Sequence, residues 1–195
     1  DHAWVIHDPR FAIDPAISSC PNGRPQHEQS AEDLIDGMNT YGVDKIVLSH
    51  PCYYGRDNAY TSHCIATYPE RFAGIGLLIG HRLHPPASPQ NPKRLERAIK
   101  EEHLTGMRLS PIYDPDVAWL NDSCCYPLWK KAEELSAVFN IFLRPHQINE
   151  VADMAARFPG VPSRRQLLQP WPARIECEAF VDLASAQEDL RTIVF

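Results

Sequence analysis

The amino-acid sequence predicts an α/β fold with parallel strands, arranged as a partial or truncated (β/α)8 TIM-barrel-like sheet. Short apolar segments alternate with amphipathic segments along the 195 residues and give five successive strand–helix units. No glycine-rich GxGxxG turn follows an expected strand, which disfavours a doubly wound dinucleotide-binding sheet. Polar residues also gather just after the expected strands, where a barrel builds its site. These residues are His50, Tyr54, His81, Arg108 and His146.

The first unit begins at the apolar segment AWVI, residues 3–6, which predicts a short strand followed by a proline-rich loop. Ser30 and Asp33 then stand three residues apart, the spacing of a capping box at the start of a helix. We expect this helix to run to about Tyr41. Gly42 is the residue type that terminates helices in the left-handed conformation.

The second and third units follow the same pattern. KIVLSH at 45–50 is a continuous apolar run of the kind found in buried parallel strands, and a helix is expected over 59–68. FAGIGLLIG at 72–80 predicts the third strand, and the charged segment at 93–103 predicts its helix. In the second unit, the polar loop PCYYGRDN separates the strand from the helix.

The last two units are a strand at 106–110 with a helix at 125–137, and a strand at 138–143 with a helix at 149–158. A complete barrel of this type needs about 250 residues. Five units would therefore leave two open sheet edges, which must be covered. A homo-oligomer could cover them, as could the end of the chain.

Composition excludes several classes of protein. Hydrophobic residues make up 44% and charged residues 23%, and the net charge is −6 without a long basic run, so no nucleic-acid partner is expected. No apolar stretch is long enough for a membrane span, and the N-terminus lacks the pattern of a signal peptide. Scattered cysteines without CxxC spacing predict reduced thiols and a cytoplasmic protein. They are Cys20, Cys52, Cys64, Cys124, Cys125 and Cys177.

Five segments resemble a known family in their order and spacing. They are HAWV…DPRF, YGVDKIVLSHPCYYGRDNAY, YPERFAGIGLL, GMRLSP and RFPGVP. Together they are similar to the amidohydrolase-related family of metal-dependent hydrolases, which includes lactone hydrolases and nonoxidative aromatic decarboxylases on a (β/α)8 barrel. The resemblance covers residues 1–162 as one barrel-like domain and leaves residues 163–195 as an unmatched tail.

The resemblance implies a divalent metal, expected to be zinc, that activates water against a lactone or amide carbonyl. The family's first strand carries D-x-H-x-H, and His2 stands at one of these histidines while Trp4 replaces the other. His7 lies at an odd offset from His2 and would face the other side of a regular strand. His146 occupies the place of a third ligand, after the fifth expected strand. No histidine follows it, so a later histidine ligand is missing from this sequence.

Other residues are expected to act on the substrate, which the resemblance implies is a lactone or a small carboxylated cyclic compound. Arg108 matches the family's position for an arginine that holds a carboxylate, and Tyr54 and Asn58 lie in the loop that can bind substrate. His50 ends a strand and, with His146, is expected to take part in catalysis.

Alternatives remain open from the residues alone. Arg108 could instead form an ion pair with Asp114 or Asp116, and Asn58 could instead cap the following helix, which is the preferred reading. For the whole chain, two other functions compete with the metal-dependent hydrolase. One is a partial barrel without catalytic activity. The other is a metal-independent lactonase or decarboxylase in which arginine and histidine do the acid–base and electrostatic work.

Overall fold

The protein, seen in a computed structural model that describes residues 1–16, 24–79, 84–114 and 116–167, is built on one parallel sheet. Its five strands lie in the order in which they occur in the chain, and each pairs in parallel with the next. They are β1 (Ile46–Ser49), β2 (Phe72–Ile79), β3 (Gly106–Leu109), β4 (Val138–Leu143) and β5 (Ser163–Leu167). A doubly wound sheet reverses its strand order, whereas a barrel does not. The observed order is that of a partial barrel.

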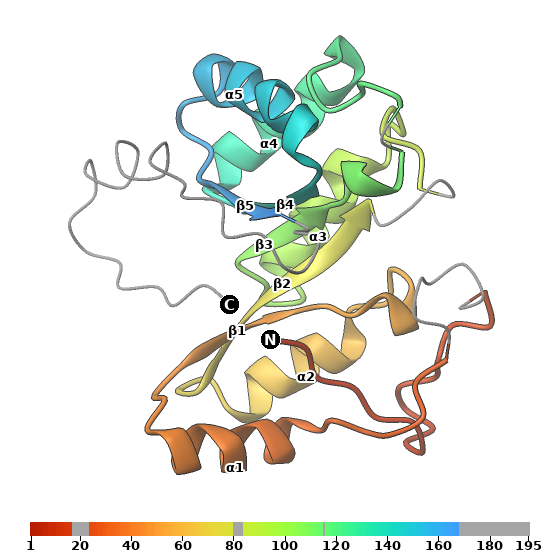
Figure 1. The fold of residues 1–195 in the computed structure, drawn as a ribbon, viewed down its shortest axis with the longest axis vertical. Helices are drawn as coiled ribbons and strands as arrows, with labels where there is room; N and C mark the ends of the chain where they lie inside the picture. Colours follow the sequence, from red (N-terminus) through yellow and green to blue (C-terminus); the bar gives the residue numbers. More distant parts are fainter. Residues whose placement is uncertain (17–23, 80–83, 115, 168–195) are drawn as a thin grey trace.

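Five helices accompany the strands. They are α1 (Ala31–Tyr41), α2 (Ala59–Thr67), α3 (Asn91–Lys100), α4 (Tyr126–Leu135) and α5 (Ile148–Arg157). Each lies within about two residues of the predicted range, apart from the C-terminal end of α3. Figure 1 shows the helices following the outside of the curved sheet, from the β1 edge with α2 to the β5 edge with α5. This one-sided cover is the arrangement that a sequential parallel sheet imposes.

Helix α1 has the predicted ends. The Asp33 backbone N–H donates to Ser30 Oγ at 3.1 Å, and the Ser30 N–H donates to Asp33 Oδ2 at 2.8 Å, so the capping box is confirmed. Gly42 ends the helix with φ of 68°, a left-handed conformation in which a side chain is unfavourable. The local sequence therefore fixes both ends of this helix.

The core lies between the sheet and the helices. In β4 the alternate side chains Phe139, Ile141 and Leu143 are fully buried, while the residues between them are half-buried. Trp129 of α4 packs edge-on against Phe139 with ring centroids 5.0 Å apart. The other face of the strands is the inner face of the partial barrel.

The predicted first strand at 3–6 is wrong. Asp1 does pair with β1, since its nitrogen donates to Val47 O at 2.9 Å and its carbonyl accepts from Ser49 N at 2.7 Å. Trp4, however, makes only an isolated antiparallel bridge with Gln29. The backbone beyond it is held by side chains instead of a strand, because Val5 N donates to Tyr54 Oη and His7 N donates to Glu28 Oε1. No ladder along β1 can then form.

A strand follows residue 162, where none was expected. Ser163 to Leu167 pairs with β4 from Phe139↔Ser163 to Leu143↔Leu167. Its sequence, SRRQL, has no apolar run, so hydrophobic pattern could not reveal it. The sheet thus reaches five strands without the expected N-terminal one. The rest of the expected tail, from residue 168, lies outside the described residues.

The expectations about a membrane span and about the cysteines can be compared with the structure. No helix of the described residues is both long and apolar enough to cross a membrane. Cys52 is disulfide-bonded, so the expectation of reduced cysteines is wrong for this residue, while Cys64, Cys124 and Cys125 are free thiols. Disulfides are uncommon in the cytosol. The cysteines therefore no longer support the cytoplasmic prediction. Cys20 and Cys177 lie outside the described residues.

Candidate functional site

A cluster of polar side chains lies at the carboxyl ends of β1 and β3. Ser49 is the last residue of β1, and its carbonyl oxygen is 2.6 Å from His2 Nδ1. Arg108 of β3 reaches across the intervening strand and donates from Nη1 to Ser49 Oγ at 3.4 Å. His50 follows Ser49 directly. The structure therefore brings together His2, His50 and Arg108, three of the predicted site residues, at the edge where barrels carry their sites.

Arg108 is the buried charge of this cluster. Arg108 is only 6% exposed, and its Nε has no hydrogen-bond partner among the described residues. Ser110 Oγ, two residues further on, is also buried without such a partner. Burial lowers the pKa of Arg108, but a guanidinium stays charged in proteins. A buried guanidinium that is only partly hydrogen-bonded is suited to an anion.

The two histidines beside Arg108 are held in their neutral form. Burial and the charge of Arg108 lower the pKa of His2 to about 4 and that of His50 to about 3. His50 Nδ1 lies 2.9 Å from Thr61 Oγ1, and its Nε2 is buried without a partner among the described residues. Because the Ser49 carbonyl can only accept, His2 carries its proton on Nδ1, and Nε2 keeps a lone pair.

Tyr54 lies next to the cluster, with its ring centroid 5.8 Å from that of His50. Its hydroxyl donates to Val5 O at 2.9 Å and accepts from Val5 N at 2.8 Å. Burial raises the pKa of this phenol to about 12, so it remains protonated. Tyr54 thus fastens the N-terminal segment beside the cluster, and its hydroxyl is already engaged in both directions.

Asn58 does not join the cluster. Its Oδ1 accepts from Leu77 N at 3.1 Å and its Nδ2 donates to Glu102 Oε2 at 3.0 Å. Asn58 does stand at the N-cap position of α2, as expected, but its side chain makes no capping hydrogen bond, and Asp57 Oδ1 accepts from the Ala59 N–H at 3.0 Å instead. The neighbouring residue supplies the cap, which sequence alone could not separate from Asn58.

His146 lies on the short 3-10 turn Pro145–Gln147 after β4, and its side chain is exposed. The position after a strand agrees with the sequence prediction. Within the described part of the chain, however, no three His, Cys, Asp or Glu side chains come together in a way that could hold a metal ion. His2 and His146 therefore have no third ligand among the described residues.

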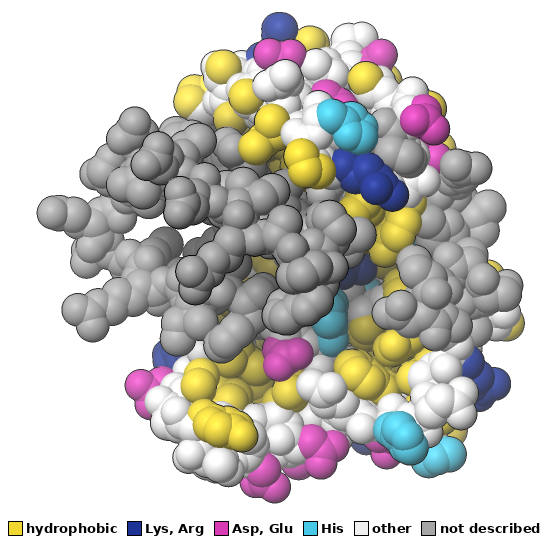
Figure 2. Space-filling view, viewed as in Figure 1, with side chains coloured by type: hydrophobic (Ala, Val, Ile, Leu, Met, Phe, Trp, Pro, Cys, Tyr) yellow, Lys and Arg dark blue, Asp and Glu magenta, His cyan; other side chains and the backbone are white. Residues whose placement is uncertain are grey.

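Sequence reasoning missed two members of the site, Ser49 and Ser110. Both stand at the ends of strands, and an even spacing places Ser110 on the same strand face as Arg108. The two-residue spacing between Arg108 and Ser110 could therefore have revealed Ser110 from the sequence. Figure 2 shows the surroundings on the surface, where histidine and Lys or Arg side chains lie beside hydrophobic ones in a hollow between the upper and lower parts of the molecule.

Comparison with known proteins gives a family and a fold. The model of the family described as Amidohydrolase matches residues 6–163. A solved structure from Acinetobacter baumannii, named probable 2-pyrone-4,6-dicarboxylic acid hydrolase and holding citric acid, is 16% identical with a TM-score of 0.63. The match covers 84% of this chain and 55% of that one.

Two further solved structures are similar. A 2,6-dihydroxybenzoate decarboxylase in complex with 2,6-dihydroxybenzoate is 13% identical, with a TM-score of 0.54 over 68% of this chain and 54% of that one. An uncharacterised TIM-barrel protein from Bordetella bronchiseptica is 15% identical, with a TM-score of 0.53 over 69% and 50%. A search of curated protein sequences finds no match. The chain thus spans little more than half the length of the barrels it resembles.

Proposed function

The chain belongs to the amidohydrolase family, and on this premise we propose that it binds and hydrolyses a lactone or another small carboxylated cyclic compound at the carboxyl ends of β1 and β3. The observation that carries the proposal is the buried Arg108, whose Nε has no partner among the described residues. A substrate carboxylate can accept from two N–H groups of a guanidinium at once. Such a contact in a buried site also orients the ring for attack.

His2 is the residue best placed to handle a proton. Its Nδ1–H is fixed on the Ser49 carbonyl at 2.6 Å, which leaves the Nε2 lone pair to accept a proton from water. The nearby Arg108 keeps the imidazole neutral by lowering its pKa to about 4, together with burial. His50 supplies a second neutral imidazole. In this proposal water attacks the lactone carbonyl while His2 accepts its proton, the acyl C–O bond of the ring then breaks, and His2 returns the proton to the departing ring oxygen.

The family resemblance implies a divalent metal, and we tested whether the described residues fit one. His2 does fit a ligand's pattern, since a metal-bound histidine commonly donates its other N–H to a carbonyl. The donor set does not fit, because Trp4 takes the place of a second histidine and the Arg108 charge in the cluster would repel a dication. No step of the proposed hydrolysis is therefore routed through a metal. Zinc on His2 and His146 stays a prediction, which metal content per chain tests.

The first experiment measures binding and turnover of 2-pyrone-4,6-dicarboxylate and of 2,6-dihydroxybenzoate by the 195-residue chain. We expect Arg108→Lys to weaken binding about tenfold, because an ammonium cannot make two parallel bonds, and Arg108→Gln to weaken it further. Lys130→Gln, which removes an exposed charge on α4, is the matched control. Circular dichroism checks the fold of each variant. Equal binding by Arg108→Gln and the unchanged chain would refute the proposal.

A second candidate function is a partial barrel without catalysis. The described sheet has five strands, and the cluster lacks a third metal ligand in the described residues, which together favour this reading. Binding of the carboxylated probes without turnover would support it. Turnover that persists in the presence of a chelator would instead support the metal-independent enzyme, and turnover that the chelator abolishes would support the metal-dependent one.

A further inference from the structure

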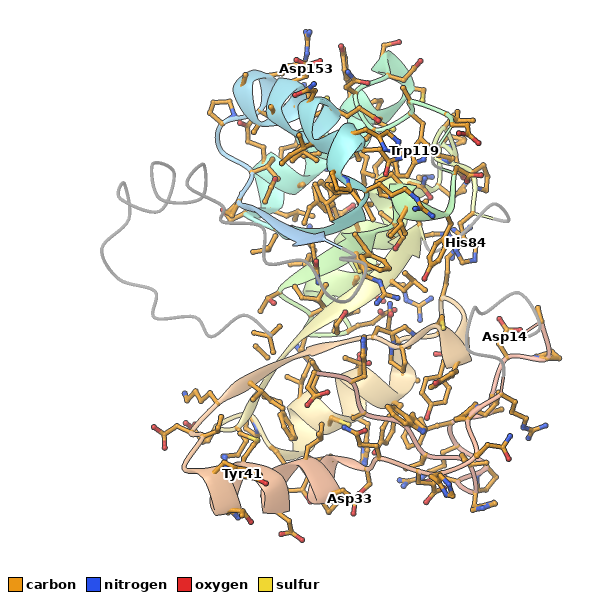
Figure 3. The ribbon with its side chains drawn as sticks, viewed as in Figure 1. Asp14, Asp33, Tyr41, His84, Trp119 and Asp153 are labelled. Atoms are coloured by element: carbon orange, nitrogen blue, oxygen red, sulfur yellow. The ribbon has the colours of Figure 1, made fainter. Side chains whose placement is uncertain are left out.

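A cavity lies on the α3 side of the sheet. It has a volume of about 620 Å³. It is lined by the N-terminal loop 12–15, by the loop 54–58 before α2, and by Arg94 and Arg97 of α3. Met107 lines this cavity, whereas the adjacent Arg108 bonds to Ser49 on the inner face of the barrel. Figure 3 labels Asp14 on the N-terminal loop and His84 on the segment after β2, and in that view both lie toward the same side of the molecule.

Three arginines line the cavity, and they differ in their partners. Arg97 forms ion pairs with Glu102 at 3.2 Å and with Glu101 at 3.6 Å. Arg56 and Arg94 take part in no ion pair formed between described residues. They lie close enough to repel each other, since burial and the charge of Arg94 both lower the pKa of Arg56. Two guanidinium groups therefore line one cavity without an ion-pair partner among the described residues.

The carboxylates of the lining are engaged elsewhere. Asp14 Oδ1 accepts from the Ala16 N–H at 2.8 Å, and Asp57 accepts from the Ala59 N–H as the cap of α2. Glu102 accepts from Asn58 at 3.0 Å and pairs with Arg97. Each carboxylate thus stabilises a turn, a helix start or another side chain. These carboxylates keep their charge, but among the described residues none of them lies within ion-pair distance of Arg56 or Arg94.

The remaining lining is apolar. Ile13, Leu77, Leu78 and Met107 contribute to it, and Leu77 and Leu78 are almost fully buried. The cavity thus combines a charged part with a smaller apolar part. A ligand that contacts both parts would place an apolar body against these side chains and a negative group at Arg56 and Arg94.

From these contacts we propose that the cavity between the loop 54–58 and α3 binds a small organic anion, with a carboxylate or phosphate group held by Arg56 and Arg94 and an apolar body against Leu78 and Met107. Tyr54 borders both this cavity and the Arg108 cluster, but the two sites use different arginines. Anion binding in the cavity does not depend on the function proposed for the Arg108 cluster.

The test uses the full chain and two probes, inorganic phosphate and benzoate, followed by amide chemical shifts on titration. We expect saturable shifts in the loop 54–58 and at the start of α3. Arg56→Gln and Arg94→Gln should each weaken binding about tenfold or more, since hydrogen bonds to charged groups are among the strong ones. Lys93→Gln, which removes the same charge one residue away on α3 and outside the cavity lining, is the control and should bind as the unchanged chain does.

Each outcome decides the proposal. Saturable binding lost in both arginine variants and kept in Lys93→Gln supports it, and the stronger probe shows whether carboxylate or phosphate is preferred. Shifts that follow Arg108→Gln instead would assign the anion to the inner face and overturn it. Absence of saturable shifts with either probe would overturn it as well, and so would equal weakening by Lys93→Gln. Unfolding midpoints of the variants without probe exclude loss of fold as the cause.

Discussion

At the scale of single residues, the candidate site depends on one permanent charge. Arg108 is buried beside two imidazoles, and its guanidinium disfavours a second positive charge on either of them. Burial and this charge together lower the pKa of His2 and of His50 and keep both imidazoles neutral. In the proposed function, the same charge would also hold a substrate carboxylate.

The lowered histidine pKa values predict acid sensitivity. The unfolded chain takes up a proton on His50 near the ordinary value of 6.5, whereas the folded chain does so only at about 3. Stability is therefore complete above pH 6.5 and falls as the pH drops toward 3, by up to ~1.4 kcal/mol per pH unit for each such histidine. We expect His50→Gln to reduce this slope of the free energy of unfolding.

Urea unfolding between about pH 7 and about pH 4 measures the slope, because in this interval a histidine of the unfolded chain takes up a proton while the folded His50 does not. His27→Gln, which changes an exposed histidine in the same way, is the control and should leave the slope near that of the unchanged chain. An unaltered slope in His50→Gln would show that this histidine titrates normally in the folded protein.

At the scale of elements, local sequence determines helix ends more firmly than it determines strands. Helix α1 begins at a reciprocal Ser30–Asp33 cap and ends at a left-handed glycine, and both features involve residues within four positions of one another. Strand β5 has no comparable local mark. Its pairing with β4 depends on backbone groups that the preceding helix α5 brings back to the sheet.

Two glycines, one inside helix α1 and one at its C-terminal cap, should respond oppositely to the same substitution. Gly37 lies inside α1, and an added Cβ there would meet nothing within 4 Å. Gly37→Ala should therefore stabilise the protein by ~0.5–1 kcal/mol, through the better helix propensity of alanine.

Gly42 is equally uncrowded but has φ of 68°, so Gly42→Ala should destabilise by roughly 1 kcal/mol through backbone strain alone. Thermal or urea unfolding of the two variants in parallel checks this pair. Each variant serves as the control of the other because neither adds a steric contact. A shift of both midpoints in the same direction would contradict the assignment of the helix end.

At the scale of the whole molecule, a five-stranded parallel sheet leaves part of its inner face uncovered. Val47 of β1 is 39% exposed, and Asn140 and Phe142 of β4, on the face opposite the core, are only half-buried. In a closed barrel such side chains are covered by further strands. The solved structures that the chain resembles have the length for those strands, since it covers only 50–55% of the three described above.

We therefore expect the 195-residue chain, studied by itself, to self-associate through this face. Light scattering over a range of protein concentrations should show a mass that rises above that of one chain. Val47→Lys should shift the equilibrium toward the monomer, because it places a charge on the contact face. Val117→Lys, at a valine that is 56% exposed in a loop, is the control. A monomer at every concentration would contradict the expectation.

The sequence by itself determined the parts that depend on near neighbours. The cap and end of α1, the apolar runs of β1, β2, β3 and β4, and the alternation that makes the sheet parallel could all be predicted, because propensity and hydrophobic period act over a few residues. The polar residues after the strand ends favoured the barrel, and the family resemblance agreed with it. The placement of His50 and Arg108 after or near strand ends also followed, since parallel strands end at one edge.

Only the tertiary structure decided how those side chains are used. It turned Asn58 toward Leu77 and Glu102, engaged the Tyr54 hydroxyl with Val5, and recruited Glu28 to hold the segment that was expected to be a strand. It also made SRRQL a strand. These outcomes depend on pairs of groups 19 to 49 residues apart. Which of several polar groups satisfies a buried donor is settled by the packing that brings them together, and no local pattern contains that information.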